Sequence, residues 1–138
     1  CAERPETWIN REIIKNYCLL HQRGHAHCLE VWNKEELIGG IYGVSIGAVF
    51  FGESMFSKKS NASKIALAYL VNRLKETGFK LFDTQFLTPH LASLGAIEIP
   101  KTEYKILLFK AVEEVANFCA SSYSPDVSAI AQRRAQTS

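Results

Sequence analysis

The stretch HAHCLEVWNKEELIGGIYGVSIGAVFFGE, residues 25–53, decides the fold class of this chain of 138 residues. β-branched, aromatic and other apolar residues recur there in three short runs, separated by polar or glycine-containing residues that are typical of turns. We expect strands at 25–32, 37–42 and 48–53, with turns at 33–36 and 43–47. Because the turns are short, consecutive strands must run antiparallel, and the stretch predicts a three-stranded meander.

Helices are expected on both sides of this meander, since apolar residues elsewhere recur every three or four positions. Thr7 is a candidate N-cap for a first helix that ends near Gln22. A second helix is expected to begin at Ser60 or Asn61 and to end before Gly78. The remaining predictions are a strand at 79–85, a short helix at 89–94, a strand at 96–99 and a helix from 102 to about 122. This order of elements predicts an α+β fold with helices on the faces of a mixed sheet.

Composition limits the class of protein. Apolar residues make up 47% and charged residues 22%, which is ordinary for a globular chain with a core, and the formal net charge is only +2. No apolar run approaches the roughly 20 residues that span a bilayer. The four cysteines form no C-x-x-C pair, so we expect buried free thiols and no zinc ribbon or redox dithiol. We predict one domain over 1–122 and a disordered polar tail over 123–138.

Several motifs follow one another in a specific order along the chain. They are TWI (7–9), GHAH (24–27), GGIYGV (39–44), FFGESMFS (50–57), NASK (61–64), DTQFLTPHLASLGA (83–96) and EIP (98–100). Together they closely resemble the bacterial leucyl/phenylalanyl-tRNA–protein transferases over about residues 1–105. The resemblance implies a catalytic domain related in fold to the GCN5-related N-acetyltransferases, in which the central strands splay apart around the acyl group. Members of the family carry an additional N-terminal domain that helps to bind the 3′ end of tRNA.

The resemblance also implies an activity. The family moves Leu, Phe and, less readily, Met from aminoacyl-tRNA to the N-terminal α-amine of proteins that begin with Arg or Lys, and so marks them for degradation. The reaction is the aminolysis of an ester by an amine, and its transfer step needs no metal, CoA, ATP or other cofactor. We therefore expect a cytoplasmic, monomeric enzyme without a membrane partner.

Three polar residues are the catalytic candidates that the resemblance implies. Asp83 and Gln85 stand two apart on the predicted strand 79–85, so both side chains are expected on one face. Either Gln85, polarised by Asp83, accepts the proton of the attacking amine, or Asp83 holds the amine while Gln85 orients it. Glu53 is expected to bind an ammonium group, and Gly52 before it to let a ligand approach the backbone. Without the motif, Asp83 would fit equally well as a turn cap at the end of a strand.

Binding residues are implied around these three. Six apolar residues match the family's pocket for the amino-acid side chain: Ile41, Phe50, Met55, Leu67, Leu70 and Phe82. Such a pocket discriminates weakly, by about 1–3 kcal/mol per methylene, which suits Leu, Phe and Met alike, and core packing is the alternative at each position. Trp8 matches a residue that stacks on the terminal adenosine, an interaction of about 1–3 kcal/mol. Lys58, Lys59 and Lys64 are weaker candidates for contacts with tRNA phosphates.

Two other functions stay open at this point. A CoA-dependent N-acetyltransferase would share the fold, but such enzymes bind pyrophosphate with a glycine-containing loop before a helix. The corresponding stretch here, SKKSNASK at 57–64, contains no glycine. A non-catalytic binder of basic N-termini is the third possibility, although it would not need Asp83, Gln85 and Glu53 together.

Overall fold

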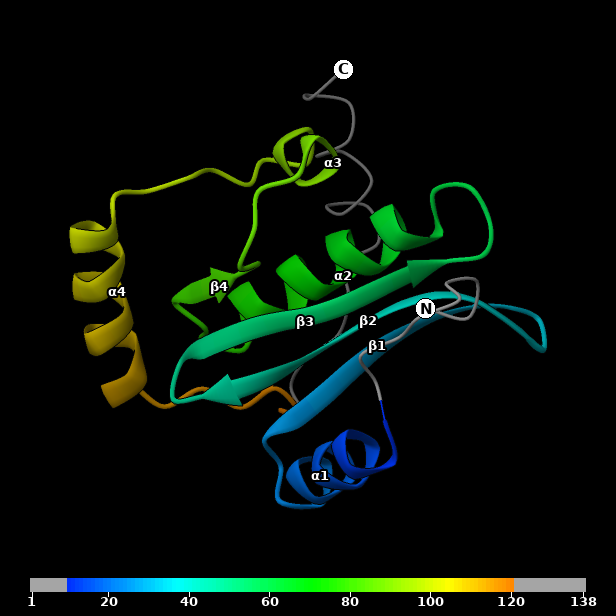
Figure 1. Ribbon diagram of the computed structural model, residues 1–138, viewed down its shortest axis with the longest axis horizontal. Coiled ribbons are helices and arrows are strands. Elements are labelled where there is room, and N and C mark those ends of the chain that lie inside the picture. The colour runs from blue at the N-terminus through cyan, green and yellow to red at the C-terminus, as the bar shows by residue number, and fades with distance from the viewer. Residues whose placement is uncertain (1–9, 121–138) are drawn as a thin grey trace.

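A computed structural model describes residues 10–120 of the chain, and within this range four strands form one sheet. The elements are α1 (Arg11–Gln22), β1 (Ala26–Asn33), β2 (Glu36–Ile46), β3 (Val49–Ser57), α2 (Ala62–Glu76), β4 (Leu81–Asp83), α3 (Pro89–Ala92) and α4 (Lys101–Glu113). The strands lie in the order β1-β2-β3-β4, with the first three antiparallel and β4 parallel to β3 (Figure 1). This mixed sheet with flanking helices confirms the α+β class and the predicted meander.

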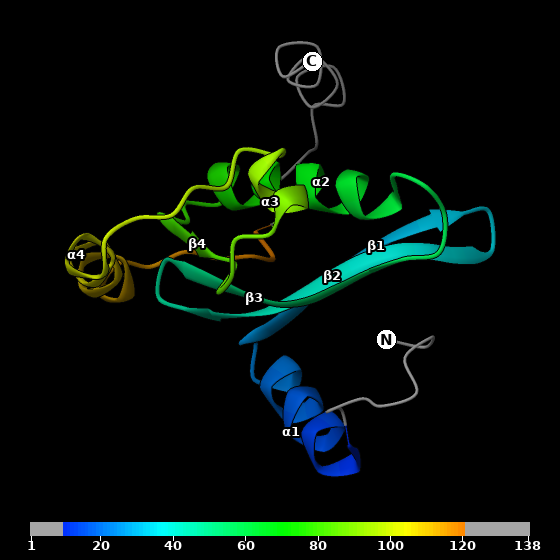
Figure 2. The same ribbon diagram turned by 45° about the horizontal axis from the view of Figure 1, so that its top comes forward.

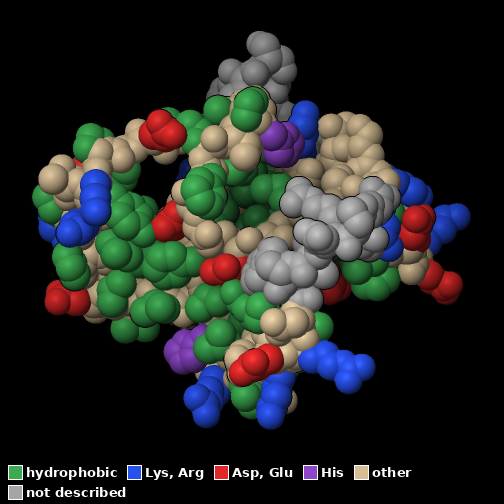
Figure 3. All heavy atoms as spheres, in the orientation of Figure 1, with side chains coloured by type: hydrophobic (Ala, Val, Ile, Leu, Met, Phe, Trp, Pro, Cys, Tyr) green, Lys and Arg blue, Asp and Glu red, His purple; other side chains and the backbone are tan. Residues whose placement is uncertain are grey.

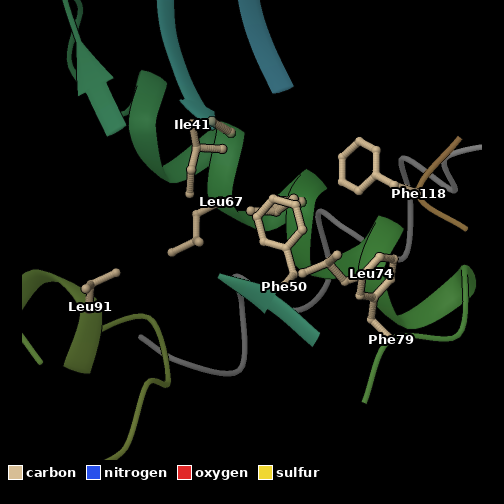
Figure 4. Close-up of a cluster of buried hydrophobic side chains, with 9 residues drawn as sticks. Ile41, Phe50, Leu67, Leu74, Phe79, Leu91 and Phe118 are labelled. Atoms are coloured by element: carbon tan, nitrogen blue, oxygen red, sulfur yellow. The ribbon is translucent and has the colours of Figure 1, made fainter. Parts of the chain in front are cut away.

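The helices lie on different sides of the sheet. α2 and the short α3 cover one face, α1 lies against the other, and α4 stands at the end of the sheet near β3 and β4 (Figure 2). The core fills the space between α2 and the sheet, where Phe50 of β3 and Leu70 of α2 are almost completely buried. Figure 4 shows Leu74, Phe79 and Phe118 gathered around Phe50. None of the described helices is long and apolar enough to cross a membrane.

The β2–β3 hairpin is longer than the sequence predicts. Both strands extend beyond their expected ends, and the chain turns only at Gly47, whose φ is +56°. Gly43 stays within β2, where a Cβ would overlap the Phe51 carbonyl oxygen and lie 2.6 Å from the Phe50 ring. The prediction of a turn at 43–47 is wrong because glycine serves here for close packing inside the sheet, a use that composition does not separate from a turn.

The first two helices begin with different capping arrangements. α1 starts after Asn10, which is extended and whose side-chain oxygen accepts from the Ile13 amide at 2.9 Å. Thr7, the expected cap, lies outside the described residues. α2 follows Asn61 as predicted, but Asn61 has a left-handed φ of +66° and makes no side-chain capping bond. The helix therefore begins where expected without the expected side-chain cap.

The chain departs most from the prediction beyond β4. β4 ends at Asp83, residues 96–99 form no strand, and α4 ends at Glu113 instead of near 122. The segment between α3 and α4 arches away from the sheet, and Figure 3 shows open space between this arch and the rest of the molecule. Residues 96–99 therefore have no described strand beside them to pair with. α4 ends early because the following segment turns back and buries Phe118 in the core.

The helices and strands described above do not test the predicted domain limits. The fold accounts for residues 10–120 as one layered unit around one sheet. The boundary at residue 122 stays a prediction, and the polar tail at 123–138 lies outside the described residues.

Candidate active site

The three catalytic candidates gather where β3 and β4 separate. The parallel pairing of these strands joins only Val49–Phe51 to Leu81–Asp83, after which β3 continues and β4 ends. Gln85 reaches back across this point, since its side-chain amide nitrogen donates to the Gly52 carbonyl oxygen at 3.3 Å. Glu53 follows Gly52 directly. The structure thus brings all three predicted residues to one end of the β3–β4 junction.

Asp83 is the last residue of β4, and each of its carboxylate oxygens has a donor. Oδ1 accepts from the Gln85 backbone amide at 2.7 Å, and Oδ2 accepts from the Tyr104 hydroxyl at 2.6 Å. The first bond closes a turn in which Gln85 has a left-handed φ of +66°. The prediction that Asp83 and Gln85 share a strand face is wrong, because the strand ends between them and Asp83 caps the turn that follows.

Tyr104 links α4 to this turn. The hydrogen bond to Asp83, then burial and the charge of Asp83, raise the pKa of Tyr104 to about 12. The phenol therefore stays protonated at neutral pH and remains a donor. Local pattern does not indicate this role, because a helical tyrosine is usually part of a packing face and its partner here lies 21 residues away.

Glu53 occupies an irregular position in the β2–β3 ladder. Gly52 and Ser54 on either side of it pair with Gly43 and Tyr42, which leaves Glu53 as the extra residue of a β-bulge. A bulge redirects the side chain of its extra residue and strengthens the local twist. Glu53 is half-buried as a result, unlike an ordinary surface glutamate.

Two tyrosines surround the Glu53 carboxylate on the face that carries α1. Tyr17 of α1 and Tyr42 of β2 meet edge to face with ring centroids 5.4 Å apart. Burial, then the charge of Glu53 and the hydrogen bond to it, raise the pKa of Tyr17 to about 12. Burial and the charge of Glu53 also raise the pKa of Tyr42. The first helix of the structure therefore places a phenol beside the second carboxylate of the site.

The six apolar candidates form one continuous cluster. Four of them are buried core residues: Ile41, Phe50, Leu67 and Leu70. The other two, Met55 and Phe82, are partly buried and pack against that core. Gly52 adjoins the cluster, because a Cβ there would lie only 3.0 Å from the Phe82 ring. The group that approaches Gly52 closely is thus the Phe82 ring of the protein itself. The approach of a ligand to Gly52 stays a prediction.

The weaker nucleic-acid candidates lie apart from this junction. Lys59 forms an ion pair with Glu36 at 2.6 Å, and this pair lowers the pKa of Glu36. Lys58 and Lys64 are exposed around the start of α2. Trp8 lies outside the described residues. The structure therefore groups the three lysines near one helix end without testing their role.

The sheet face that carries α1 is hollowed next to Tyr42. A cavity of about 510 Å³ lies between α1 and β1, and a second of about 300 Å³ lies over the first three strands. Tyr42 and Cys28 line both, while Tyr17 lines the larger one. Because Tyr17 and Tyr42 also surround Glu53, an apolar hollow adjoins this carboxylate. The strand and helix patterns alone did not reveal it.

The cysteines differ from expectation in their exposure. Three cysteines of the described part are free, as predicted, but exposed: Cys18, Cys28 and Cys119. The prediction of buried thiols is wrong because Cys18 and Cys28 line the hollow beside α1 instead of the core under α2. Among residues 10–120, no three His, Cys, Asp or Glu side chains are grouped as a metal ion would need.

Comparison with known proteins agrees with the motifs. The family model described as leucyl/phenylalanyl-tRNA protein transferase matches residues 1–109, a range that includes the whole β3–β4 junction and Tyr104. A protein of that name from Ruegeria pomeroyi is 60% identical over 139 aligned residues, which cover 100% of this chain and 65% of the relative. Another from Cereibacter sphaeroides is 56% identical over 138 residues, covering 100% of this chain and 64% of the relative. The chain thus spans just under two thirds of the length of these relatives, and it belongs to the leucyl/phenylalanyl-tRNA–protein transferase family.

Proposed function

We propose that the chain forms the catalytic part of an aminoacyltransferase. It moves Leu, Phe and, less readily, Met from aminoacyl-tRNA to the N-terminal α-amine of proteins that begin with Arg or Lys, and so marks them for degradation. It acts as a monomer in the cytoplasm and uses no cofactor in the transfer step. Family membership supports this proposal, and the observation that carries it is the position of Glu53, Asp83 and Gln85 at one end of the β3–β4 junction.

The reaction exchanges one bond for another. The acceptor α-amine attacks the carbonyl carbon of the aminoacyl ester, so that a C–N bond forms while the C–O bond to the tRNA ribose breaks. The amine loses a proton and the ribose oxygen gains one, which balances the step. Because the ester is already activated, positioning is the main task of the site, and it can contribute on the order of 7 kcal/mol or more to lowering the barrier.

The contacts of Asp83 favour one of the two schemes for Gln85. Asp83 accepts from the backbone amide of Gln85 and not from its side chain, so it does not polarise the side-chain amide directly. An amide oxygen is a very weak base compared with a carboxylate or an imidazole. Gln85 therefore serves as an orienting group, whose amide oxygen accepts from the attacking amine while its nitrogen is held by Gly52.

Glu53 is the candidate for binding an ammonium group. Its carboxylate is half-buried and lies beside the Tyr17 phenol, and it keeps lone pairs to accept further bonds. Two ammonium groups enter the reaction: the α-amine of the donor amino acid and the acceptor N-terminus with its Arg or Lys side chain. A carboxylate suits either of them.

The donor side chain is assigned to the apolar cluster under α2. Met55 and Phe82 are the members that stay partly exposed, so they form its accessible edge. Methionine adapts to side chains of different shape, which suits a site shared by Leu, Phe and Met. Trp8 would stack on the terminal adenosine, and Lys58, Lys59 and Lys64 would contact phosphates. The exposed Lys59–Glu36 pair is no obstacle, since such pairs contribute about 0–1 kcal/mol.

A transfer assay with the full-length protein tests this function. Phe-tRNA labelled in the amino acid is offered with a peptide that begins with Arg, and the same peptide with an acetylated N-terminus is the control. Label should appear on the free peptide alone. No transfer to the free peptide would refute the proposal, and acetyl transfer from acetyl-CoA to it would support an N-acetyltransferase instead.

Asp83→Ala identifies the site within the same assay. We expect kcat/KM for transfer to fall about a hundredfold or more, because both the turn and the orientation of Gln85 lose their support. The circular dichroism spectrum should stay that of the wild type, since Asp83 lies at the end of a strand of three residues. Transfer at the wild-type rate would remove Asp83 from the mechanism.

A further inference from the structure

We propose that Tyr104 is a positioning residue for transfer: its hydroxyl fixes Asp83, and Asp83 holds the Gln85 backbone in the conformation that brings the Gln85 amide to Gly52. The inference rests on the proposed function and deepens it. It assigns to α4 a part in the reaction, although α4 supplies no group that touches either substrate in the scheme above. Tyr104 acts only through Asp83.

The contact between Tyr104 and Asp83 is short and charge-assisted. The Tyr104 hydroxyl donates to Oδ2 at 2.6 Å, and both side chains are partly buried. Hydroxyl-to-carboxylate bonds of 2.5–2.7 Å are roughly twice as strong as bonds between neutral groups. The raised pKa of Tyr104 agrees with a phenol that keeps its proton in this contact. Tyr104 therefore restricts the rotation of the Asp83 carboxylate.

The turn after β4 needs such support. Gln85 has a φ of +66°, a left-handed conformation that residues other than glycine, asparagine and aspartate rarely adopt. The bond from the Gln85 amide to Asp83 Oδ1, at 2.7 Å, closes this turn from one side. The Gln85 side chain then lies within 3.3 Å of the Gly52 carbonyl oxygen, directly before Glu53. A rotation of the Asp83 carboxylate would release this amide and with it the side chain of Gln85.

α4 is fixed independently of the turn. The Ala48 amide, in the β2–β3 connection, donates to the Ala111 carbonyl oxygen at 2.8 Å, and Ala111 is only 2% exposed. Gly47 lies so close to Val112 that a Cβ would overlap the Val112 backbone. Helix α4 is thus held on the hairpin that leads into β3. Through Tyr104, the position of Asp83 is therefore linked to β3, the strand that carries Glu53.

Tyr104→Phe in the full-length protein tests the inference, because it removes one oxygen and keeps the ring. Tyr69→Phe, on α2 and outside the site, is the matched control. We expect kcat for transfer to fall about tenfold or more with KM for both substrates within about twofold, since a positioning loss acts on the reaction step. In ¹⁵N-labelled protein, the backbone and side-chain amide signals of Gln85 should shift, while the control leaves them in place.

A double-mutant cycle with Asp83→Ala separates a positioning role from a structural one. If Tyr104 acts through Asp83, Tyr104→Phe has no further effect on kcat in the Asp83→Ala protein. The same loss in both backgrounds would overturn the inference, as would unchanged Gln85 signals or unchanged kcat in the single variant. A wild-type protein that does not transfer at all would refute the proposed function, and the Gln85 signals would then still decide whether Tyr104 positions this residue.

Discussion

Replacing Phe118 by alanine tests whether the segment after α4 is part of the core. Phe118 is 6% exposed, and its ring stacks on His27 with centroids 4.4 Å apart and on Phe50 at 5.5 Å. The Arg73 guanidinium lies 5.2 Å from the ring centroid and also donates to the Phe118 carbonyl oxygen at 2.8 Å. The substitution removes the ring from all these neighbours at once.

The expected loss follows from the burial of this ring. Buried Phe-to-Ala substitutions cost about 3–5 kcal/mol, from lost transfer free energy and the cavity that remains. We expect about 3 kcal/mol for Phe118→Ala, the lower end of the range, because the bond from Arg73 to the backbone carbonyl survives the change. For a domain of this size the melting temperature should fall by about 10 °C.

Urea unfolding followed by circular dichroism measures this loss. Phe109→Ala is the matched control, since it removes the same atoms from a side chain of α4 that is 69% exposed. We expect the control to change the free energy of unfolding by about 0.5 kcal/mol or less. A loss below about 1 kcal/mol in Phe118→Ala, or equal losses in both variants, would refute the place of this segment in the core.

Two further predictions concern the sheet and its pH dependence. Gly43→Ala should lower the free energy of unfolding by about 2 kcal/mol or more, because the new Cβ would overlap the Phe51 carbonyl oxygen inside the hairpin. If urea unfolding gives the variant the same free energy of unfolding as the wild type, this packing is contradicted. Burial, as the main cause, lowers the pKa of His27 from its ordinary 6.5, so the folded state favours the neutral ring. The unfolded chain therefore takes up a proton first as pH falls below 6.5, and the stability that His27 contributes is present above that pH and lost below it. His27→Gln should show a smaller loss of stability between about pH 7.5 and 5 than the wild type; identical losses would show that another group causes the change.

The meander could be predicted because its pattern is local. Runs of apolar residues between 25 and 53, separated by turn residues, identified three strands, and a fourth was expected at 79–85 after a helix. The turn expected at 43–47 failed at Gly43, where glycine packs against an aromatic ring of the neighbouring strand. The need for glycine at this position comes from residues of β3, and the sequence pattern around Gly43 does not show which residues of β3 will face it.

The end of α4 could not be predicted for a related reason. The sequence continues with residues that a helix would accept, so a helix to about residue 122 was the natural expectation. The chain instead leaves the helix after Glu113, and Phe118 reaches the core between β1 and α2. The burial of one aromatic ring against distant elements outweighs the local preference for helix. The pattern of apolar residues within the segment does not predict this burial.

The candidate site was predicted in its residues but not in its geometry. Motif resemblance identified Glu53, Asp83 and Gln85, and the structure brings them to one junction. The two-residue repeat of a strand predicts that Asp83 and Gln85 lie on one face. In the structure the strand ends at Asp83, and the hydrogen bond between the two residues closes a turn. Their tyrosine partners went unnoticed because each lies on a helix far away in the sequence.

Those partners make the site depend on the least buried helices. Glu53 lies beside the Tyr17 phenol of α1, which has no buried residue, and Asp83 has its donor from α4, where only Ala111 is buried. Elements with so little buried surface open locally at lower free energy than the sheet and α2. Opening of either helix would release one carboxylate while the core around Phe50 stays intact. The order of the two carboxylates therefore depends in part on how firmly α1 and α4 are docked.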